Sequence, residues 1–267
     1  MIPMPERILV VVAHADDMEF LAGGTVAKMV EGGSEVAELI VTNNERGSYD
    51  LPPGELVERS RQEAEAAASV LGLRQVEFLD YPDGMLSDFR FNEVRERIMY
   101  HIRKFRPDTI ITWDPFAPYE THQDHRITGM AAAEAAGFAN LPLFHPGQVK
   151  TKDDLVTVSG KYYIAKHHIN QNHVVDITGQ IDKKIQALLC HHTQMELTLE
   201  GIKRSIRATG SYLDLYRSID PKRYETFIDW AVRKHDAQVG SNEGFEFGEV
   251  FRVDTGDDLS SLFDEPP

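Results

Sequence analysis

The chain has 267 residues, which are enough for one α/β domain with a sizeable core. Its composition, with 42% hydrophobic and 27% charged residues, is ordinary for a globular protein and argues against a disordered or fibrous chain. The 43 acidic side chains outnumber the 28 basic ones, giving a formal charge of −15. That charge repels nucleic-acid phosphates and anionic lipid, so we expect no nucleic-acid or membrane partner and a neutral or cationic small-molecule substrate.

The sequence holds one cysteine, Cys190, which excludes an intramolecular disulfide and a cysteine-rich zinc site. A metal ion would therefore be held by histidines and carboxylates. The first apolar stretch, residues 8–13, is far shorter than a signal-peptide core or a membrane span. We expect a cytoplasmic protein.

Strand and helix patterns alternate along the first half of the chain. Residues 8–13 are continuously apolar and β-branched, which is typical of a strand covered on both faces, and residues 20–33 have helical spacing that ends at a Gly-Gly pair. Further strands are predicted at 35–41, 76–79 and 108–113, and further helices at 56–71, 92–105 and 127–136. This alternation predicts a Rossmann-like α/β fold, a mostly parallel sheet with helices on both faces.

The second half of the chain changes character after a connector at residues 141–147. Strands are predicted at 161–165, 173–177 and 247–253, and helices at 182–191 and over much of 198–237. We interpret the chain as a single domain with three parts: a Rossmann-like core at 1–140, a mainly helical C-terminal elaboration at 141–253, and an acidic tail at 254–267 that is expected to fray.

Two polar clusters follow predicted strands. His14, Asp16 and Asp17 come directly after the first strand, and residues 121–125 (THQDH) follow the strand at 108–113. Because ligands bind beyond the carboxyl ends of parallel strands, the two clusters can bring His14, Asp17 and His125 together. Two histidines and one carboxylate with an open coordination position are the ligand set of a catalytic zinc that activates water.

Each cluster alone has a plainer interpretation. A lone histidine or aspartate here can be a helix cap or a surface polar group, and Asp124 or Thr121 can cap the helix that follows. A nucleotide-binding Rossmann protein is a further alternative, but its first turn needs a G-x-G-x-x-G pattern, and this sequence has histidine and aspartate there.

The clusters resemble the signatures of the LmbE-like, or PIG-L, family of N-acetylglucosamine deacetylases. Residues 13–17 (AHADD) are similar to its A-H-(P/A)-D-D motif, and residues 122–125 (HQDH) to its H-P-D-H motif, with Gln123 in place of proline. Individually weaker resemblances extend over most of the chain, at Thr42 to Glu45 with Asn44 where glycine is usual, Glu63 to Gly72, Asp80 to Leu86, Lys184 to Gln194, and Gly248 to Phe251.

The resemblance implies a zinc ion, or another divalent metal, on His14, Asp17 and His125. It also implies that Asp16 is the general base, which takes a proton from the attacking water and returns it to the departing amine. A protonated His122 would help the metal to hold the tetrahedral oxyanion. Relatives frequently form trimers or hexamers, so the resemblance also implies a homo-oligomer.

The role of Asp124 has two interpretations. A histidine beside a metal commonly needs a carboxylate or carbonyl on its second nitrogen, so Asp124 is expected to orient His122 as part of the catalytic set. The alternative is a plain helix cap.

Substrate contacts are implied for Asp83 and Glu45, in the loops that resemble family motifs. The family often has an arginine three residues before the Glu63 position, where this chain has Ser60 flanked by Arg59 and Arg61. Either arginine can take over that sugar contact if the helix is rotated or shifted, or both belong to a solvated helix face.

Three more side chains near these motifs are open to two interpretations. Tyr119 can donate a hydrogen bond to the substrate or be a packed loop aromatic, and its neighbour Glu120 stands where some relatives carry tyrosine. His167 and His168 can reach the substrate or a neighbouring subunit, or be surface polar groups.

The leading hypothesis is a zinc-dependent hydrolase that removes an N-acetyl group from a GlcNAc-type amino sugar. A related amidase that cleaves a larger acyl group from a glucosamine conjugate is one alternative. A catalytically silent sugar- or metal-binding module is another, and the predicted ligands and base argue against it.

Overall fold

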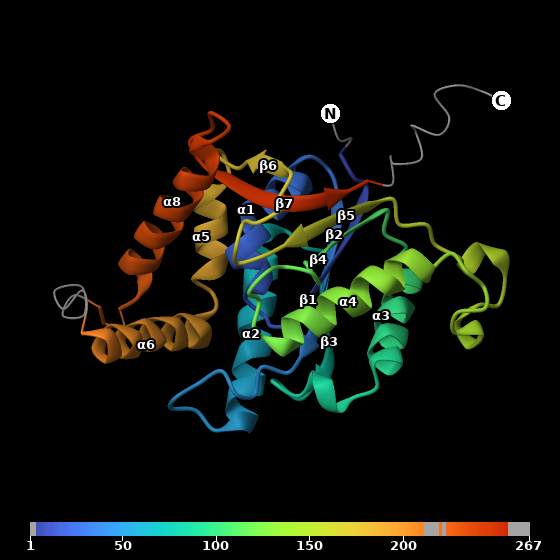
Figure 1. Ribbon diagram of the computed structural model, residues 1–267, viewed down its shortest axis with the longest axis horizontal. Coiled ribbons are helices and arrows are strands. Elements are labelled where there is room, and N and C mark those ends of the chain that lie inside the picture. The colour runs from blue at the N-terminus through green and yellow to red at the C-terminus, as the bar shows by residue number, and fades with distance from the viewer. Residues whose placement is uncertain (1–3, 211–218, 221–222, 256–267) are drawn as a thin grey trace.

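The computed structural model describes residues 4–210, 219–220 and 223–255. Its centre is a seven-stranded sheet in the order β3-β2-β1-β4-β5-β7-β6 (Figure 1). Five neighbouring strands are parallel: β1 (Arg7–Val12), β2 (Glu35–Thr42), β3 (Gln75–Tyr81), β4 (Thr109–Trp113) and β5 (Gly160–Ile164). Beyond β5, β7 (Gly248–Asp254) and β6 (His173–Asp176) pair in the antiparallel sense. The predicted Rossmann-like, mostly parallel sheet is confirmed.

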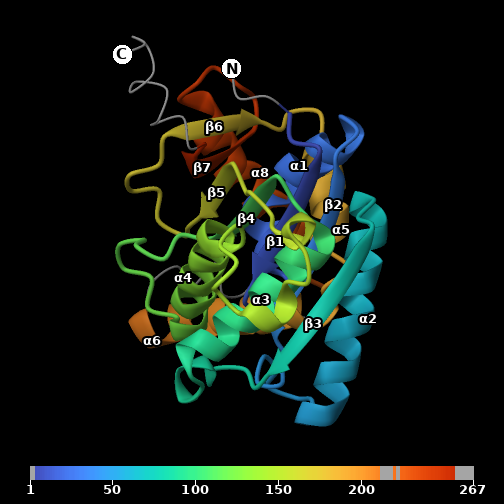
Figure 2. The same cartoon turned by 90° about the vertical axis from the view of Figure 1, so that its right-hand side faces the viewer.

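Helices cover both faces of this sheet, as predicted (Figure 2). One hydrophobic core lies under α1 (Asp17–Glu31) and α2 (Pro53–Leu71). A second core lies on the opposite face, under α3 (Phe91–Phe105) and α4 (Gln123–Phe138). The two faces are therefore closed separately, and the carboxyl edge of the sheet stays free for a site.

The central strand β1 contributes to both cores. Its residues alternate between them, with Val10 in the core under α1 and α2 and Val11 in the core under α3 and α4, and both are fully buried. Because both faces of this strand are buried, its positions favour apolar side chains, which explains the continuous apolar run in the sequence.

The C-terminal part adds α5 (Ile181–Leu188), α6 (His192–Thr209) and α8 (Glu225–Ser241), which share a third hydrophobic core (Figure 1). The expected mainly helical elaboration is therefore present. In the described part of the expected helical region at 198–237, the helices are α6 and α8, and residues 211–218 and 221–222 lie outside the described residues, as does the tail beyond 255. The division of the chain at 140 and 253 stays a prediction.

Two helices begin earlier than their apolar spacing predicts. α1 begins at Asp17 and not near residue 20, and α4 begins at Gln123 and not near residue 127. Their first turns carry acidic side chains, which the positive end of a helix favours but which interrupt the apolar pattern used to find it. Both polar clusters therefore lie at helix N-termini on the carboxyl edge of the sheet.

Gly129 lets α4 come close to the end of β4. A Cβ atom at this position would lie 2.3 Å from the carbonyl oxygen of Trp113, a contact that only glycine avoids. The first turn of α4, with His125, is thereby held against the strand ends.

No helix in the described part of the chain is long and apolar enough to cross a bilayer. The cytoplasmic location and the homo-oligomer stay predictions.

Candidate active site

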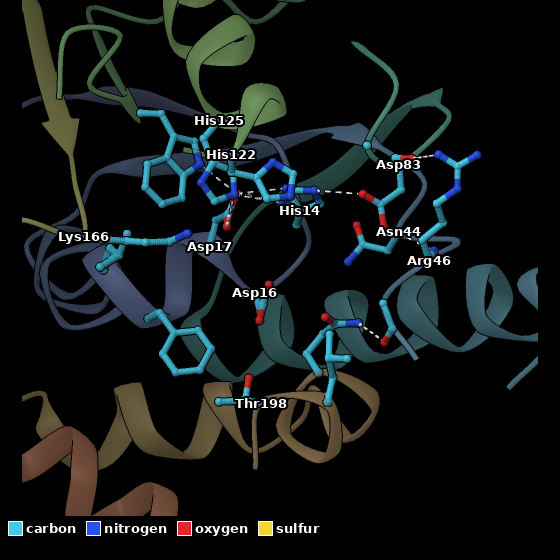
Figure 3. Close-up of a pocket in the computed structure, with 17 residues that line it drawn as sticks. His14, Asp16, Asp17, Asn44, Arg46, Asp83, His122, His125, Lys166 and Thr198 are labelled. Carbon is cyan, nitrogen blue, oxygen red and sulfur yellow. Dashed lines mark hydrogen bonds and ion pairs between the residues drawn. The ribbon is translucent and has the colours of Figure 1, made fainter. Parts of the chain in front are cut away.

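A cavity of about 640 Å³ opens at the carboxyl ends of the parallel strands (Figure 3). Both polar clusters reach it, together with loops after β2, β3 and β5 and the start of α6. Its polar lining includes His14, Asp16, Asp17, Asn44, Arg46, Asp83, His122, His125, Lys166, Gln194 and Thr198, and its apolar lining includes Phe20, Leu21, Trp113 and Leu197.

Side chains of the two clusters meet at one point of this cavity. The Nδ1 atom of His14 lies 3.1 Å from the Nε2 atom of His125. Asp17 Oδ2 lies 3.7 Å from His14 Nδ1, and Asp17 Oδ1 lies 3.6 Å from His125 Nε2. In a tetrahedral shell with bonds of about 2.0–2.2 Å, neighbouring donor atoms are roughly 3.3–3.6 Å apart, which is close to the separations of His125 Nε2 from His14 Nδ1 and from Asp17 Oδ1.

Other donor sets lie close to these atoms. The rings of His14, His122 and His125 offer nitrogen atoms that all lie within 4.8 Å of one another, and His14, Asp83 and Asp124 form a second such group. The neighbourhood therefore contains more histidine and carboxylate donors than one ion needs, and some of them are free for substrate or proton transfer.

Asp17 is held rigidly by its own loop and by β4. Its Oδ2 atom accepts hydrogen bonds from the backbone N–H groups of Ala13 and His14 at 3.1 and 2.9 Å and from Trp113 Nε1 at 2.8 Å. Burial opposes its ionisation, but the charge that His125 carries at low pH and the hydrogen bonds from His14 prevail and hold the pKa of Asp17 well below its usual range. Its other oxygen, Oδ1, faces His125 as a carboxylate.

His125 lies in a stack of flat rings. Trp113 is parallel to it with ring centres 3.8 Å apart, and His122 stacks on it at 4.3 Å. Burial, which outweighs the attraction to Asp17, lowers the pKa of His125 to about 4. The neutral imidazole, which is the form that binds metals, is therefore favoured near neutral pH.

Asp16 faces the same cavity from the N-cap position of α1 (Figure 3). Burial and the neighbouring charge of Asp17 raise the pKa of Asp16 to about 6. Its environment differs from that of Asp17, whose pKa moves the other way. Two adjacent carboxylates with separated pKa values suit two different chemical tasks.

His122 lies at the N-cap position of α4 and lines the cavity. Burial and the charge of His14 lower the pKa of His122, so a neutral ring is favoured here over the protonated ring that we expected. A neutral imidazole still donates one N–H.

Asp83 and Asp124 come together through His14. Asp83 Oδ1 lies 3.2 Å from His14 Nε2, and Asp124 Oδ2 lies 3.8 Å from the same atom. Asp124 is fully buried and accepts the backbone N–H groups of Gly84 and Leu86 at 2.6 and 3.2 Å. These bonds tie the Asp83 loop to α4. That Asp124 orients His122 stays a prediction.

Four expected substrate contacts lie outside the described cavity lining. Glu45 accepts a hydrogen bond from Asn43, Arg59 pairs with Glu55, Arg61 pairs with Asp80, and Tyr119 is 79% exposed. The turn of α2 explains the arginines, because Ser60 is only 2% exposed and so its neighbours point outward. Their roles stay predictions, as do those of His167, whose ring contacts Tyr119, and His168, whose ring contacts His235.

The structure adds residues to the site that the sequence motifs did not predict. Trp113 supports both Asp17 and His125, and Lys166 reaches the cavity from the loop after β5. Asn44 adopts a left-handed conformation with φ 57, which glycine and asparagine tolerate best. Asparagine at a position where the family motif has glycine therefore indicates a turn of this conformation.

Comparisons with known proteins agree with this architecture. The family model described as PIG-L, GlcNAc-PI de-N-acetylase, matches residues 9–136. A diacetylchitobiose deacetylase from Thermococcus kodakarensis is 34% identical over 193 residues, which cover 71% of this chain and 70% of that protein. A 4-oxalmesaconate hydratase from Pseudomonas putida is 27% identical over 216 residues, covering 75% and 80%.

A solved structure extends the similarity to almost the whole chain. N,N'-diacetylchitobiose deacetylase from Pyrococcus horikoshii matches with a TM-score of 0.76 at 28% identity, covering 94% of this chain and 85% of that one. The sequence signatures, the sheet and the similarity to these proteins agree, and the chain belongs to the PIG-L family of GlcNAc-PI de-N-acetylases.

Proposed function

We propose that this protein is a metal-dependent hydrolase that removes the acetyl group from the nitrogen of a GlcNAc-type sugar. One observation carries the proposal: His125 Nε2 lies 3.1 Å from His14 Nδ1 and 3.6 Å from Asp17 Oδ1, on a cavity that Asp16 also lines. Two imidazoles and a carboxylate are typical ligands of catalytic zinc, and another divalent metal can use the same set.

The bound ion would supply Lewis-acid activation of the water and of the amide carbonyl. Asp16 accepts a proton as the water oxygen attacks the carbonyl carbon. It then gives that proton to the sugar nitrogen as the C–N bond breaks, so acetate and a free amine leave. A pKa of about 6 suits a group that must act first as base and then as acid near neutral pH.

His122 lies where it can assist at the carbonyl oxygen. Its ring contacts that of His14, with centres 4.7 Å apart, and it stacks on His125, so it borders the proposed ligands. An N–H donated from this position stabilises negative charge as it develops on the oxygen.

The cavity is large enough for more than one small sugar ring and is partly apolar. A volume of about 640 Å³ lies within the usual range of small-molecule sites, about 300–1,000 Å³. The similarity to diacetylchitobiose deacetylases supports a disaccharide or another small glycoside as substrate. The apolar wall that contains Phe20 and Leu197 keeps an amidase acting on a longer acyl chain as the second candidate.

Acetate release and metal content test the proposal together. Zinc-loaded protein is offered N-acetylglucosamine, diacetylchitobiose, and glucosamine carrying longer N-acyl chains. We expect acetate release from an N-acetyl sugar. Faster release of the longer acids would favour the second candidate, and release of neither acid would contradict a hydrolase. Hydration of 4-oxalmesaconate, the activity in the name of the Pseudomonas relative, is assayed in parallel.

Asp16→Asn separates an enzyme from a binding module. We expect zinc content to stay the same while turnover falls by about 10³-fold, in the range that loss of general acid–base catalysis gives. Asp182→Asn is the matched control, because Asp182 pairs with Arg233 on the surface, away from the cavity. Equal turnover of the Asp16 variant and wild type would contradict the assigned base.

A further inference from the structure

Glu120 is a buried carboxylate beside the cavity that has no part in the proposed reaction. It lies in the loop between β4 and α4 and is 6% exposed. Its Oε1 atom accepts the backbone N–H of His122 at 2.8 Å, and its backbone carbonyl accepts Arg126 Nη1 at 2.6 Å. Glu120 is therefore held in place independently of any ligand.

The second oxygen of Glu120 faces the far side of His125. Oε2 lies 3.3 Å from His125 Nδ1, while Nε2 of the same ring faces His14 and Asp17. Both Glu120 Oε2 and His125 Nδ1 are buried, and neither has a hydrogen bond of normal geometry in the described structure. At 3.3 Å the two atoms are within hydrogen-bonding distance, and a hydrogen bond between them would satisfy both.

A carboxylate at Nδ1 decides which nitrogen of His125 is free. In a neutral imidazole one nitrogen carries the proton and the other has the lone pair. Because the carboxylate can only accept, the proton goes to Nδ1 and the lone pair to Nε2, which points at the proposed metal position. Carboxylates behind ligand histidines act in this way in other metal sites.

Lys166 offsets the charge that Glu120 brings into this buried loop. Its Nζ atom lies 3.6 Å from Glu120 Oε2 and 5.6 Å from the centre of the Trp113 ring. The side chain is half exposed and extends toward the cavity from the side opposite Asp83 and Arg46 (Figure 3). A carboxylate with a cation beside it can stay buried at lower cost.

We propose that Glu120 is a positioning residue of the metal centre, which accepts the Nδ1 proton of His125 and aims Nε2 at the ion, with Lys166 as its counter-charge. The inference rests on the proposed function, because it requires His125 to bind the metal. It assigns a task to the residue that stands where some relatives carry tyrosine.

Glu120→Gln is the sharpest change, because it keeps the shape and the Oε1 acceptor for His122. The new amide N–H₂ group faces Nδ1 as a donor, which moves the imidazole proton to Nε2. We expect the zinc dissociation constant to rise about 10- to 100-fold. The melting temperature of the metal-free protein should stay within about 2 °C of wild type, because few contacts are lost.

The measurement is zinc titration of metal-free protein against a chromophoric chelator. Glu96→Gln is the matched control. Glu96 lies on α3 and, like Glu120, faces the Nδ1 atom of a histidine, which here is His145 at 3.5 Å. This variant should bind zinc like wild type. Lys166→Met removes the cation beside Glu120, which makes the carboxylate a stronger acceptor and lowers the repulsion of a second cation, and should tighten zinc binding by about 3- to 10-fold.

His14→Ala distinguishes failure of this inference from failure of the proposed function. If His14→Ala abolishes zinc binding while Glu120→Gln leaves it unchanged, the inference is wrong and the metal site stands. If His14→Ala binds zinc normally, the metal site itself is wrong and the inference with it. Should Glu120→Gln not fold, Lys166→Met decides, and unchanged zinc affinity in that variant overturns the inference.

Discussion

Two clusters of buried charge in this fold differ in one respect, which is whether each charge already has its partners. Where α5, α8 and β7 meet, Lys184 Nζ lies 2.7 Å from Asp236 and 2.8 Å from Glu249. Glu249 also accepts the backbone N–H groups of Gly24 and Thr25. These three side chains, the α5–α8–β7 triad, are at most 2% exposed. Each charge of the triad already has its partners among the described residues, so the triad is saturated.

The cavity cluster is the opposite case. Its imidazoles and carboxylates also lie close together, but Asp16, His14 and His125 line open space and the remaining oxygen of Asp17 faces His125 without a hydrogen bond. Saturated charges join elements of the fold, whereas unsaturated charges around a cavity can bind and react. Both clusters contain residues of family-like motifs, so a motif alone does not distinguish structure from chemistry.

The largest effect is expected from removing a side chain of the cavity cluster. His125→Ala removes one of the proposed ligands, and we expect zinc binding to be lost and acetate release to fall by 10³-fold or more, about 4 kcal/mol of transition-state stabilisation. The metal-free variant should still unfold cooperatively. Metal analysis, acetate release and circular dichroism measure these three properties, with His101→Ala on α3 as the control. Full activity in His125→Ala would contradict the chemical role proposed for the cavity cluster.

Breaking the triad should produce the reverse pattern. Lys184→Met leaves Asp236 and Glu249 buried without their cation, which costs about 3–5 kcal/mol of unfolding free energy, while the folded fraction keeps its activity. Denaturant unfolding measures the cost. Lys183→Met is the matched control, because Lys183 pairs with Glu31 on the surface and its loss costs at most about 1 kcal/mol. Equal effects of the two substitutions would contradict the structural role of the triad.

A smaller effect is expected where the fold supports the cavity. Trp113→Phe keeps a ring against His125 but removes the N–H that Asp17 accepts at 2.8 Å. We expect zinc affinity to fall about tenfold, at the lower end of the range for changes to groups that orient metal ligands. Trp230→Phe is the control, because Trp230 is 50% exposed on α8. An unchanged affinity in Trp113→Phe would show that the loop N–H groups alone hold Asp17.

The two clusters should also respond to pH in different ranges. Because burial raises the pKa of Asp16 to about 6, the carboxylate form is lost as pH falls through that value, and kcat/KM should drop about tenfold per unit below it. A bound cation acts in the opposite direction, so about 6 is an upper limit for the midpoint. A rate that rises as pH falls below 6 would contradict Asp16 as base.

The triad responds only at high pH. Burial opposes the charge on Lys184, but Glu249 and Asp236 prevail and raise its pKa above the usual 10.5. A raised lysine pKa means that the stabilisation is complete below 10.5 and is lost as pH rises through the folded value. Unfolding free energy measured from pH 7 to 11 should therefore fall only at the alkaline end.

The sequence predicts the fold and the proposed metal ligands because both depend on local patterns. The run at residues 8–13 and the alternation that follows it indicate the parallel sheet, and strand ends in such a sheet converge. His14, Asp17 and His125 each lie next to a strand or in the first turn of a helix, where topology alone brings them together.

The rest of the site depends on loops and packing that have no period. Glu120 and Lys166 lie in different loops, and only the tertiary fold brings them to 3.6 Å. The task of Trp113 depends on which ring stacks against it. In the same way, the rotation of α2 about its axis, which decides where Arg59 points, follows from packing of the whole helix.

The smallest effect is expected at Arg59, whose predicted contact with the sugar is still untested. Arg59 is half exposed and pairs with Glu55 one turn earlier on α2, at 2.6 Å. Such a pair contributes about 0.3–0.5 kcal/mol, so Arg59→Ala should leave the unfolding free energy and the KM for the sugar almost unchanged. Arg46→Ala is the informative counterpart, because Arg46 lines the cavity and donates to the backbone carbonyl of Asp83 at 2.5 Å. A KM that rises for Arg59→Ala and not for Arg46→Ala would mean that α2 turns toward the sugar when substrate binds.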